Sequence, residues 1–131
     1  MVLGPRILVV DDDPAVLLTY SMILQQHGYE VRGAPSVEVA TQALAERRYD
    51  LLVCDLALEH SRGGLDVVAF ARRLYPAIPA ILLTGYASSE ASEEAEKNGV
   101  IVLFKPLDVR ELLAAVARLI GREDRPRAQN E

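Results

Sequence analysis

The sequence predicts an α/β fold in which a five-stranded, doubly wound parallel sheet is covered by five helices. Two patterns support this prediction: short apolar runs alternate five times with longer amphipathic segments, and the short runs are nearly continuous in Val, Ile and Leu. Such runs are typical of parallel strands, whose two faces are both buried beneath helices by right-handed crossovers. The chain has 131 residues, half of them hydrophobic. That is enough for one core, so we expect a single domain over residues 1–121.

The N-terminal part of the chain is expected to form two strands, each followed by a helix. Asp13 and Pro14 favour a helix start, because an aspartate caps the first free N–H groups and a proline fits the first turn. Ser36 offers the second helix a similar cap, and Gly28 ends the first one. The expected elements are a strand at Arg6–Val10, a helix over residues 14–27, a strand at Glu30–Gly33 and a helix from Ser36 to about Glu46.

The rest of the chain repeats the alternation three times. A polar loop containing Gly63 and Gly64 separates the third strand from its helix, and Gly121 ends the last helix. Residues 122–131 are charged and lack apolar periodicity, so we interpret them as a tail or the start of a linker. The expected elements are strands at Leu51–Asp55, Ala80–Thr84 and Val100–Phe104 and helices at about 65–74, 88–98 and 108–120.

Composition excludes several classes of function. The net charge is −5 and the pI about 5.1, which argues against binding of nucleic-acid backbones by this chain. The single cysteine, Cys54, cannot form an internal disulfide and suits a reducing compartment. No apolar run approaches the roughly 20 residues of a membrane span, and the N-terminus lacks the features of a secretory signal. We therefore expect a cytoplasmic protein that contacts neither membrane nor nucleic acid.

Polar side chains stand at the carboxyl ends of four predicted strands. Three aspartates, Asp11 to Asp13, follow the first strand, while Asp55, Thr84 and Lys105 follow or end the third, fourth and fifth. In a parallel sheet these ends meet at one edge. Clustered carboxylates need a counter-charge, and a hard cation such as Mg²⁺ suits oxygen ligands best. Carboxylates, a metal, a hydroxyl and an ammonium group around one point are typical of phosphoryl transfer.

This pattern resembles the receiver domain of two-component response regulators. The resemblance covers residues 6–120 and rests on four motifs, in order and at family spacing: VVDDD, DL at Asp55, LLTGY at Thr84 and FKP at Lys105. Each motif alone is weak, but the set on a five-fold strand–helix alternation is specific. The resemblance implies a flavodoxin-like sheet with strand order 2-1-3-4-5, and it makes residues 1–121 a receiver domain.

The resemblance also implies a role for each residue at the edge. Asp55 would accept a phosphoryl group from a phosphohistidine and would ligate Mg²⁺ together with Asp12 and the main-chain carbonyl of Ala57. Asp11 would act on the metal through water, and Asp13 would only cap the helix. The remaining roles concern the phosphoryl oxygens and the loop after the fifth strand: Thr84 would hydrogen-bond one oxygen, Lys105 would pair with another, and Pro106 would follow a cis bond.

The implied partners are a histidine kinase or a histidine phosphotransfer domain, with a fused or separate output domain. Such a chain is no enzyme in the usual sense, because it catalyses only its own phosphorylation and dephosphorylation. The sequence leaves open whether it is a stand-alone regulator, the receiver of a hybrid kinase or one part of a longer regulator.

Two positions depart from the family pattern. Many receivers have a proline four residues after the acceptor, where this chain has Glu59, and the stretch EHSRGG is about one residue longer than its common form. The family pattern therefore does not predict the course of this loop or the start of the helix that follows it. The second departure is Val102, three residues before the lysine, where the family usually has Tyr or Phe.

Two alternative functions remain. A phosphatase resembling the haloacid dehalogenase superfamily would use Asp11 as nucleophile, with Asp11 and Asp13 forming its D-x-D pattern, but it would leave Asp55 without a role. A degenerate receiver would act only as an interaction module. The complete set of site residues argues against this alternative: the acidic pair Asp11 and Asp12, the acceptor Asp55, Thr84 and Lys105.

Overall fold

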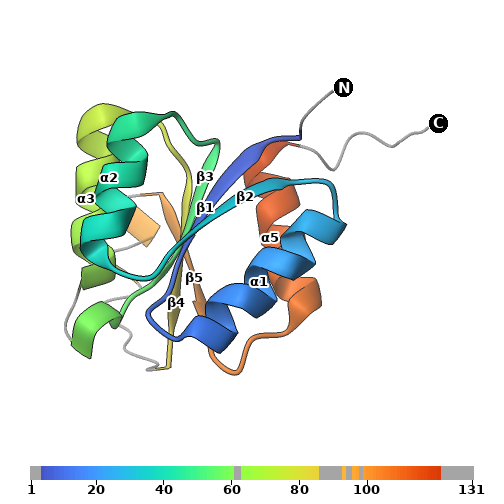
Figure 1. The fold of residues 1–131 in the computed structure, drawn as a ribbon. Helices are drawn as coiled ribbons and strands as arrows, with labels where there is room; N and C mark the ends of the chain where they lie inside the picture. Colours follow the sequence, from blue (N-terminus) through green and yellow to red (C-terminus); the bar gives the residue numbers. More distant parts are fainter. Residues whose placement is uncertain (1–3, 61–62, 86–92, 94–95, 98, 122–131) are drawn as a thin grey trace.

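The computed structural model describes residues 4–60, 63–85, 93, 96–97 and 99–121, and in them five parallel strands form one sheet (Figure 1). The order in the sheet is β2-β1-β3-β4-β5. The predicted parallel sheet and its 2-1-3-4-5 order are therefore confirmed. The strands are β1 (Arg6–Val10), β2 (Glu30–Ala34), β3 (Leu51–Asp55), β4 (Ala80–Thr84) and β5 (Val100–Phe104).

Helices cover both faces of the sheet, as a doubly wound fold requires. Helices α1 (Pro14–Gln26) and α5 (Val109–Ile120) lie on one face, and α2 (Val37–Glu46) and α3 (Gly63–Leu74) lie on the other (Figure 1). Alternate residues of each strand point to opposite faces, so Ile7 and Val9 of β1 pack toward α1 and α5, while Leu8 and Val10 pack toward α2 and α3. The sheet is thus buried on both sides, which accounts for its continuous apolar strands.

The predicted helix caps form as expected. Asp13 accepts a hydrogen bond from the N–H of Ala15 at 2.9 Å, and Ser36 accepts one from Val39 at 3.1 Å. Asp108 caps α5 in the same manner, and Gly121 ends that helix with a φ of 79°. These local interactions explain why the starts of α1, α2 and α5 are predicted to within a residue.

The connection from β3 to α3 differs from the prediction. Helix α3 begins at Gly63, two residues earlier than expected, and a short 3₁₀ turn, η1 (Leu58–His60), precedes it. Gly63 and Gly64 are therefore helical residues and not part of a flexible loop. Space explains their identity: a Cβ at position 64 would lie 2.4 Å from the carbonyl oxygen of Asp55. Glycine allows the helix to start directly against the end of β3.

Two predicted segments lie wholly or mostly outside the described residues. Of the Glu-rich helix expected at about 88–98, only Glu93, Glu96 and Lys97 are described, and these have a helical backbone. The charged segment 122–131 is not described at all, so its interpretation as a tail or linker stays a prediction. Among the described helices, none combines the length and the apolar composition that crossing a membrane requires.

Candidate functional site

The register of the sheet brings the polar strand ends to one edge. Asp55 is the last residue of β3 and pairs with Leu83, so Thr84 lies one position further along β4. The Lys105 N–H donates to the Thr84 carbonyl at 2.8 Å, which extends the pairing of β4 and β5 to the lysine. Asp11 follows β1 directly, and β1 is the other neighbour of β3. Four separate strands thus deliver the predicted residues to the same edge.

Three carboxylates form the centre of the site. One oxygen from each of Asp11, Asp12 and Asp55 lies within 4.8 Å of the other two. Asp11 is 1% exposed and Asp55 is 7% exposed, whereas Asp12 is open to solvent. The cluster therefore combines two buried carboxylates with a third, Asp12, that faces water.

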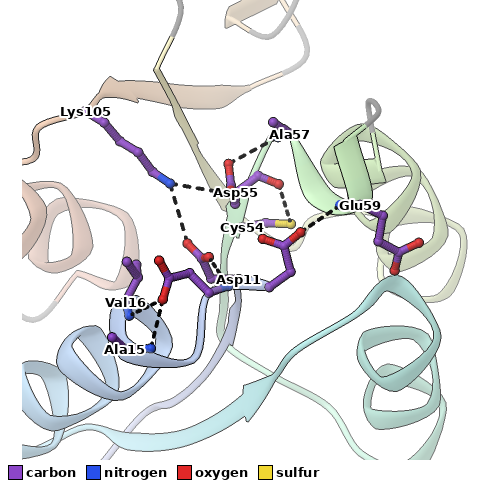
Figure 2. A network of polar contacts seen from close by, with 10 residues as sticks. Asp11, Ala15, Val16, Cys54, Asp55, Ala57, Glu59 and Lys105 are labelled. Atoms are coloured by element: carbon purple, nitrogen blue, oxygen red, sulfur yellow. Dashed lines mark hydrogen bonds and ion pairs between the residues drawn. The ribbon is translucent and has the colours of Figure 1, made fainter.

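Lys105 bridges the two buried carboxylates. Its Nζ lies 3.4 Å from Oδ2 of Asp55 and 3.6 Å from Oδ2 of Asp11 (Figure 2). Burial acts to lower the pKa of Lys105, but the charges of Asp11 and Asp55 together outweigh burial, so the pKa is raised. The lysine is therefore a fixed positive charge, held within reach of anything bound to Asp55.

The charge on Asp11 is only partly compensated. Burial raises the pKa of this carboxyl, against the hydrogen bond from the Asp13 N–H and the charge of Lys105, which lower it. Its Oδ2 is buried without a hydrogen-bond partner among the described residues. A buried carboxylate oxygen is stabilised by a nearby cation, and in the described part of the chain the nearest one, the Lys105 ammonium, lies 3.6 Å away without a hydrogen bond.

The donor set fits Mg²⁺. Three carboxylates supply hard oxygen ligands, and the exposed Asp12 leaves one side of the cluster open for water. Oδ2 of Asp11 is paired with Lys105 but has no hydrogen bond within the described residues. Mg²⁺ prefers oxygen ligands and keeps several waters, so a site built from a few carboxylates suits it. Ala57, expected to give a main-chain carbonyl, lies beside the cluster, where its N–H donates to Oδ1 of Asp55 at 3.1 Å (Figure 2).

Backbone N–H groups orient the two inner carboxylates. The Asp13 N–H donates to Oδ1 of Asp11 at 2.9 Å, and the Ala57 N–H holds Oδ1 of Asp55. In each carboxylate the second oxygen, Oδ2, is the one that faces Lys105. The side chain of Asp13 points instead to the N-terminus of α1, where it accepts from Ala15 and Val16 (Figure 2). Asp13 is thus a helix cap, as predicted.

Thr84 and Cys54 are both buried near this edge. Thr84 is 3% exposed at the end of β4. Cys54 is fully buried in the core between β3 and α3, and burial raises the pKa of its thiol well above the usual value. A buried, protonated thiol is not a nucleophile. Cys54 is therefore a small core residue.

The sequence did not predict a role for Glu59. Its backbone N–H donates to Oδ2 of Asp12 at 2.9 Å (Figure 2). The only sequence signal was its position, four residues after Asp55, where many receivers have a proline that could not make this bond.

Comparison with known proteins supports the resemblance. The family model described as the response regulator receiver domain matches residues 7–117. The transcriptional regulatory protein ZraR of Escherichia coli is 36% identical over 116 residues, covering 88% of this chain and 26% of its own length. The response regulator protein PilR of Pseudomonas aeruginosa is 32% identical over 118 residues, covering 87% and 26%. The chain thus spans about a quarter of the length of these curated relatives.

Solved structures agree. A CheY-like response regulator receiver domain protein from Methanospirillum hungatei superposes with a TM-score of 0.83 at 31% identity, covering 94% of this chain and 98% of the other. A receiver domain from Clostridium thermocellum gives a TM-score of 0.82 at 26% identity, covering 91% and 96%.

Proposed function

The chain belongs to the response regulator receiver domain family, and we propose that it accepts a phosphoryl group on Asp55 in a Mg²⁺-dependent reaction. The donor would be the phosphohistidine of a histidine kinase or of a histidine phosphotransfer domain. The observation that carries this proposal is the convergence on Asp55 of a bridging lysine and two further carboxylates at one sheet edge.

The proposed transfer is a displacement at phosphorus. An Oδ atom of Asp55 forms a bond to phosphorus while the phosphorus–nitrogen bond breaks, and the imidazole nitrogen leaves with the electron pair. Asp12, Asp55 and the Ala57 carbonyl would hold Mg²⁺, and Asp11 would act on the metal through water. The bound ion would neutralise charge on the phosphoryl oxygens. Lys105 is already 3.4 Å from the acceptor and would pair with a phosphoryl oxygen, and the Thr84 hydroxyl would hydrogen-bond another.

The phosphatase alternative finds less support. It needs Asp11 as nucleophile and Asp13 as its partner, but Asp13 is engaged with the N-terminus of α1. Asp11 is more deeply buried than Asp55. An interaction module without phosphorylation would not need the lysine held between two buried carboxylates. We therefore propose that the chain modifies itself and turns over no separate substrate.

The proposal extends to location and partners. A kinase phosphohistidine is made from ATP, so we place the reaction in the cytoplasm. The longer relatives are named as transcriptional or response regulators. We propose that phosphorylation of this domain is read by an output domain, fused or separate, and that this domain itself contacts no nucleic acid or membrane.

Acetyl phosphate should phosphorylate the protein once when Mg²⁺ is present. The intact mass, measured by mass spectrometry, is expected to rise by one phosphoryl group with millimolar Mg²⁺ and to stay unchanged with EDTA. Asp55→Asn should abolish the gain, because the amide is a poor nucleophile, while Asp50→Asn, at an exposed aspartate on the opposite edge, should not. Labelling that persists in Asp55→Asn, or steady hydrolysis of a phosphate monoester, would point to the phosphatase reading.

A further inference from the structure

Glu59 has an unusual backbone for its residue type. Its φ is 58° and its ψ is 33°, the left-handed region, and it is the only non-glycine residue with positive φ in the described parts of the chain. L-residues other than Asn and Asp rarely adopt this conformation, so the surrounding contacts must hold Glu59 there. Two hydrogen bonds do so, one from its backbone and one to its side chain.

The backbone contact reaches the acidic cluster. The left-handed conformation turns the Glu59 N–H toward Asp12, and it donates to Oδ2 of that carboxylate at 2.9 Å. Asp12 is the exposed member of the cluster, and no other hydrogen bond to its side chain is recorded among the described residues. One oxygen of Asp12 is thereby fixed, which leaves its other oxygen for a cation.

The side-chain contact reaches a different element. Oε2 of Glu59 accepts a hydrogen bond at 2.9 Å from the N–H of Val37, the first residue of α2. The first N–H groups of a helix have no partner inside the helix, and a negative charge there is favourable. The Ser36 side chain accepts a hydrogen bond from the N–H of Val39. Glu59, which lies 22 residues after Val37, accepts one from the N–H of Val37. One residue therefore joins Asp12 to the N-terminus of α2.

We propose that Glu59 is a positioning residue that couples Mg²⁺ ligation by Asp12 to the N-terminus of α2. The inference rests on the proposed function, because it takes the acidic cluster to be a metal site. Groups that hydrogen-bond a metal ligand commonly change metal affinity about 10–100-fold when removed. Coupling between two sites is reciprocal: if the α2 cap steadies Glu59 and thereby Asp12, ligation of a metal by Asp12 must steady the α2 cap.

Three substitutions at position 59 separate the two contacts. Glu59→Gly keeps the N–H and suits a positive φ, but it removes the side-chain cap on Val37. Glu59→Pro removes the N–H and fixes φ near −65°, so it loses the bond to Asp12 as well. Glu59→Gln keeps an oxygen acceptor without the charge. Glu38→Gln is the matched control, because Glu38 is an exposed carboxylate in the first turn of α2 without a side-chain contact to the cluster.

The test measures two quantities in each protein: the dissociation constant for Mg²⁺ by calorimetric titration, and the exchange rate of the Val37 amide by NMR with and without Mg²⁺. We expect Glu59→Pro to weaken Mg²⁺ binding about tenfold and Glu59→Gly, by the same reciprocity, to weaken it about fivefold. In the parent, Mg²⁺ should slow Val37 exchange about fivefold. Glu59→Gly should abolish that response, Glu59→Gln should retain part of it, and Glu38→Gln should leave it intact.

The outcomes separate this inference from the proposed function. A parent protein that binds Mg²⁺ but whose Val37 exchange ignores it, or a Glu59→Gly variant whose Val37 amide still responds, overturns the coupling and leaves the metal site standing. A parent that does not bind Mg²⁺ overturns both. If Glu59→Pro does not fold, the comparison of Glu59→Gly with the parent still decides.

Discussion

Replacing Lys105 with methionine is expected to destabilise the metal-free protein by about 2 kcal/mol at neutral pH. The lysine ammonium is the shared counter-charge of Asp11 and Asp55, which are 1% and 7% exposed. Removing one partner of a buried ion pair commonly costs about 3–5 kcal/mol, and the partial exposure of Lys105 reduces that figure. Methionine keeps most of the apolar stem, so the change reports mainly on charge.

Chemical unfolding of Lys105→Met with and without Mg²⁺ tests this expectation. Mg²⁺ should restore much of the lost stability, because a bound cation replaces the missing charge. The control is Lys97→Met, at the other lysine of the sequence, which is exposed and should change stability by less than about 0.5 kcal/mol. Equal unfolding free energies for parent and Lys105→Met would mean that the buried carboxylates do not need the lysine.

The effect of Lys105→Met should also depend on pH. The pKa of Asp11 is raised in the folded protein, so ionisation of this carboxyl destabilises the fold. The stabilisation that comes with its protonation is fully present below the pKa of Asp11 in the unfolded state. It is lost as the pH rises through the pKa of Asp11 in the folded state. Without Lys105 that folded value should rise further. The deficit of Lys105→Met is therefore expected to shrink as the pH is lowered toward 4, the ordinary range of an aspartate.

Gly64→Ala is expected to lower the free energy of unfolding by about 3 kcal/mol. An alanine usually stabilises a helix relative to glycine by about 0.5–1 kcal/mol, but here the new Cβ would lie 2.4 Å from the Asp55 carbonyl oxygen and 2.7 Å from Cα of Leu56. Both are backbone atoms that cannot turn aside. The end of β3 or the start of α3 must therefore move, and overpacking of this kind commonly costs about 1–3 kcal/mol or more.

Denaturant unfolding of two glycine variants checks the steric argument. Gly85→Ala is the control, because a Cβ at position 85 would meet no atom of the described residues within 4 Å apart from its own residue and chain neighbours. Gly85→Ala should leave the free energy of unfolding nearly unchanged, whereas Gly64→Ala should show most of the expected decrease. Because the clash is with the acceptor's own backbone, Gly64→Ala should also slow phosphorylation by acetyl phosphate in whatever fraction remains folded. Stability within about 0.5 kcal/mol of the parent would contradict this view of the β3–α3 connection.

Local sequence signals account for most of the fold. The strands β1, β3, β4 and β5 are short runs of Val, Ile and Leu, and their observed bounds are the predicted ones, while β2 extends one residue further to Ala34. The helix caps depend on contacts two or three residues away, as at Asp13 and Ser36. Signals of this range can be read from the sequence without knowing the fold.

Interactions between distant segments could not be predicted in this way. The sequence predicts a loop at Gly63 and Gly64, because glycine usually interrupts helices. Gly64 is needed instead for a close backbone approach to β3 that appears only in three dimensions. The contacts of Glu59 join residues 47 and 22 positions apart, and no periodic pattern encodes them. The acidic cluster was predictable because a parallel sheet places strand ends together, but the bridging position of Lys105 was not.

Asp55, and no other aspartate of the cluster, is expected to receive the phosphoryl group. The most direct measurement is to label the protein with acetyl phosphate and Mg²⁺, reduce the acyl phosphate with borohydride, and sequence the peptides by tandem mass spectrometry. We expect the resulting homoserine at position 55 alone, within the LLVCDL segment. A homoserine at position 11 or 12 would contradict it, because the residue that Lys105 and its neighbours surround would then not be the acceptor.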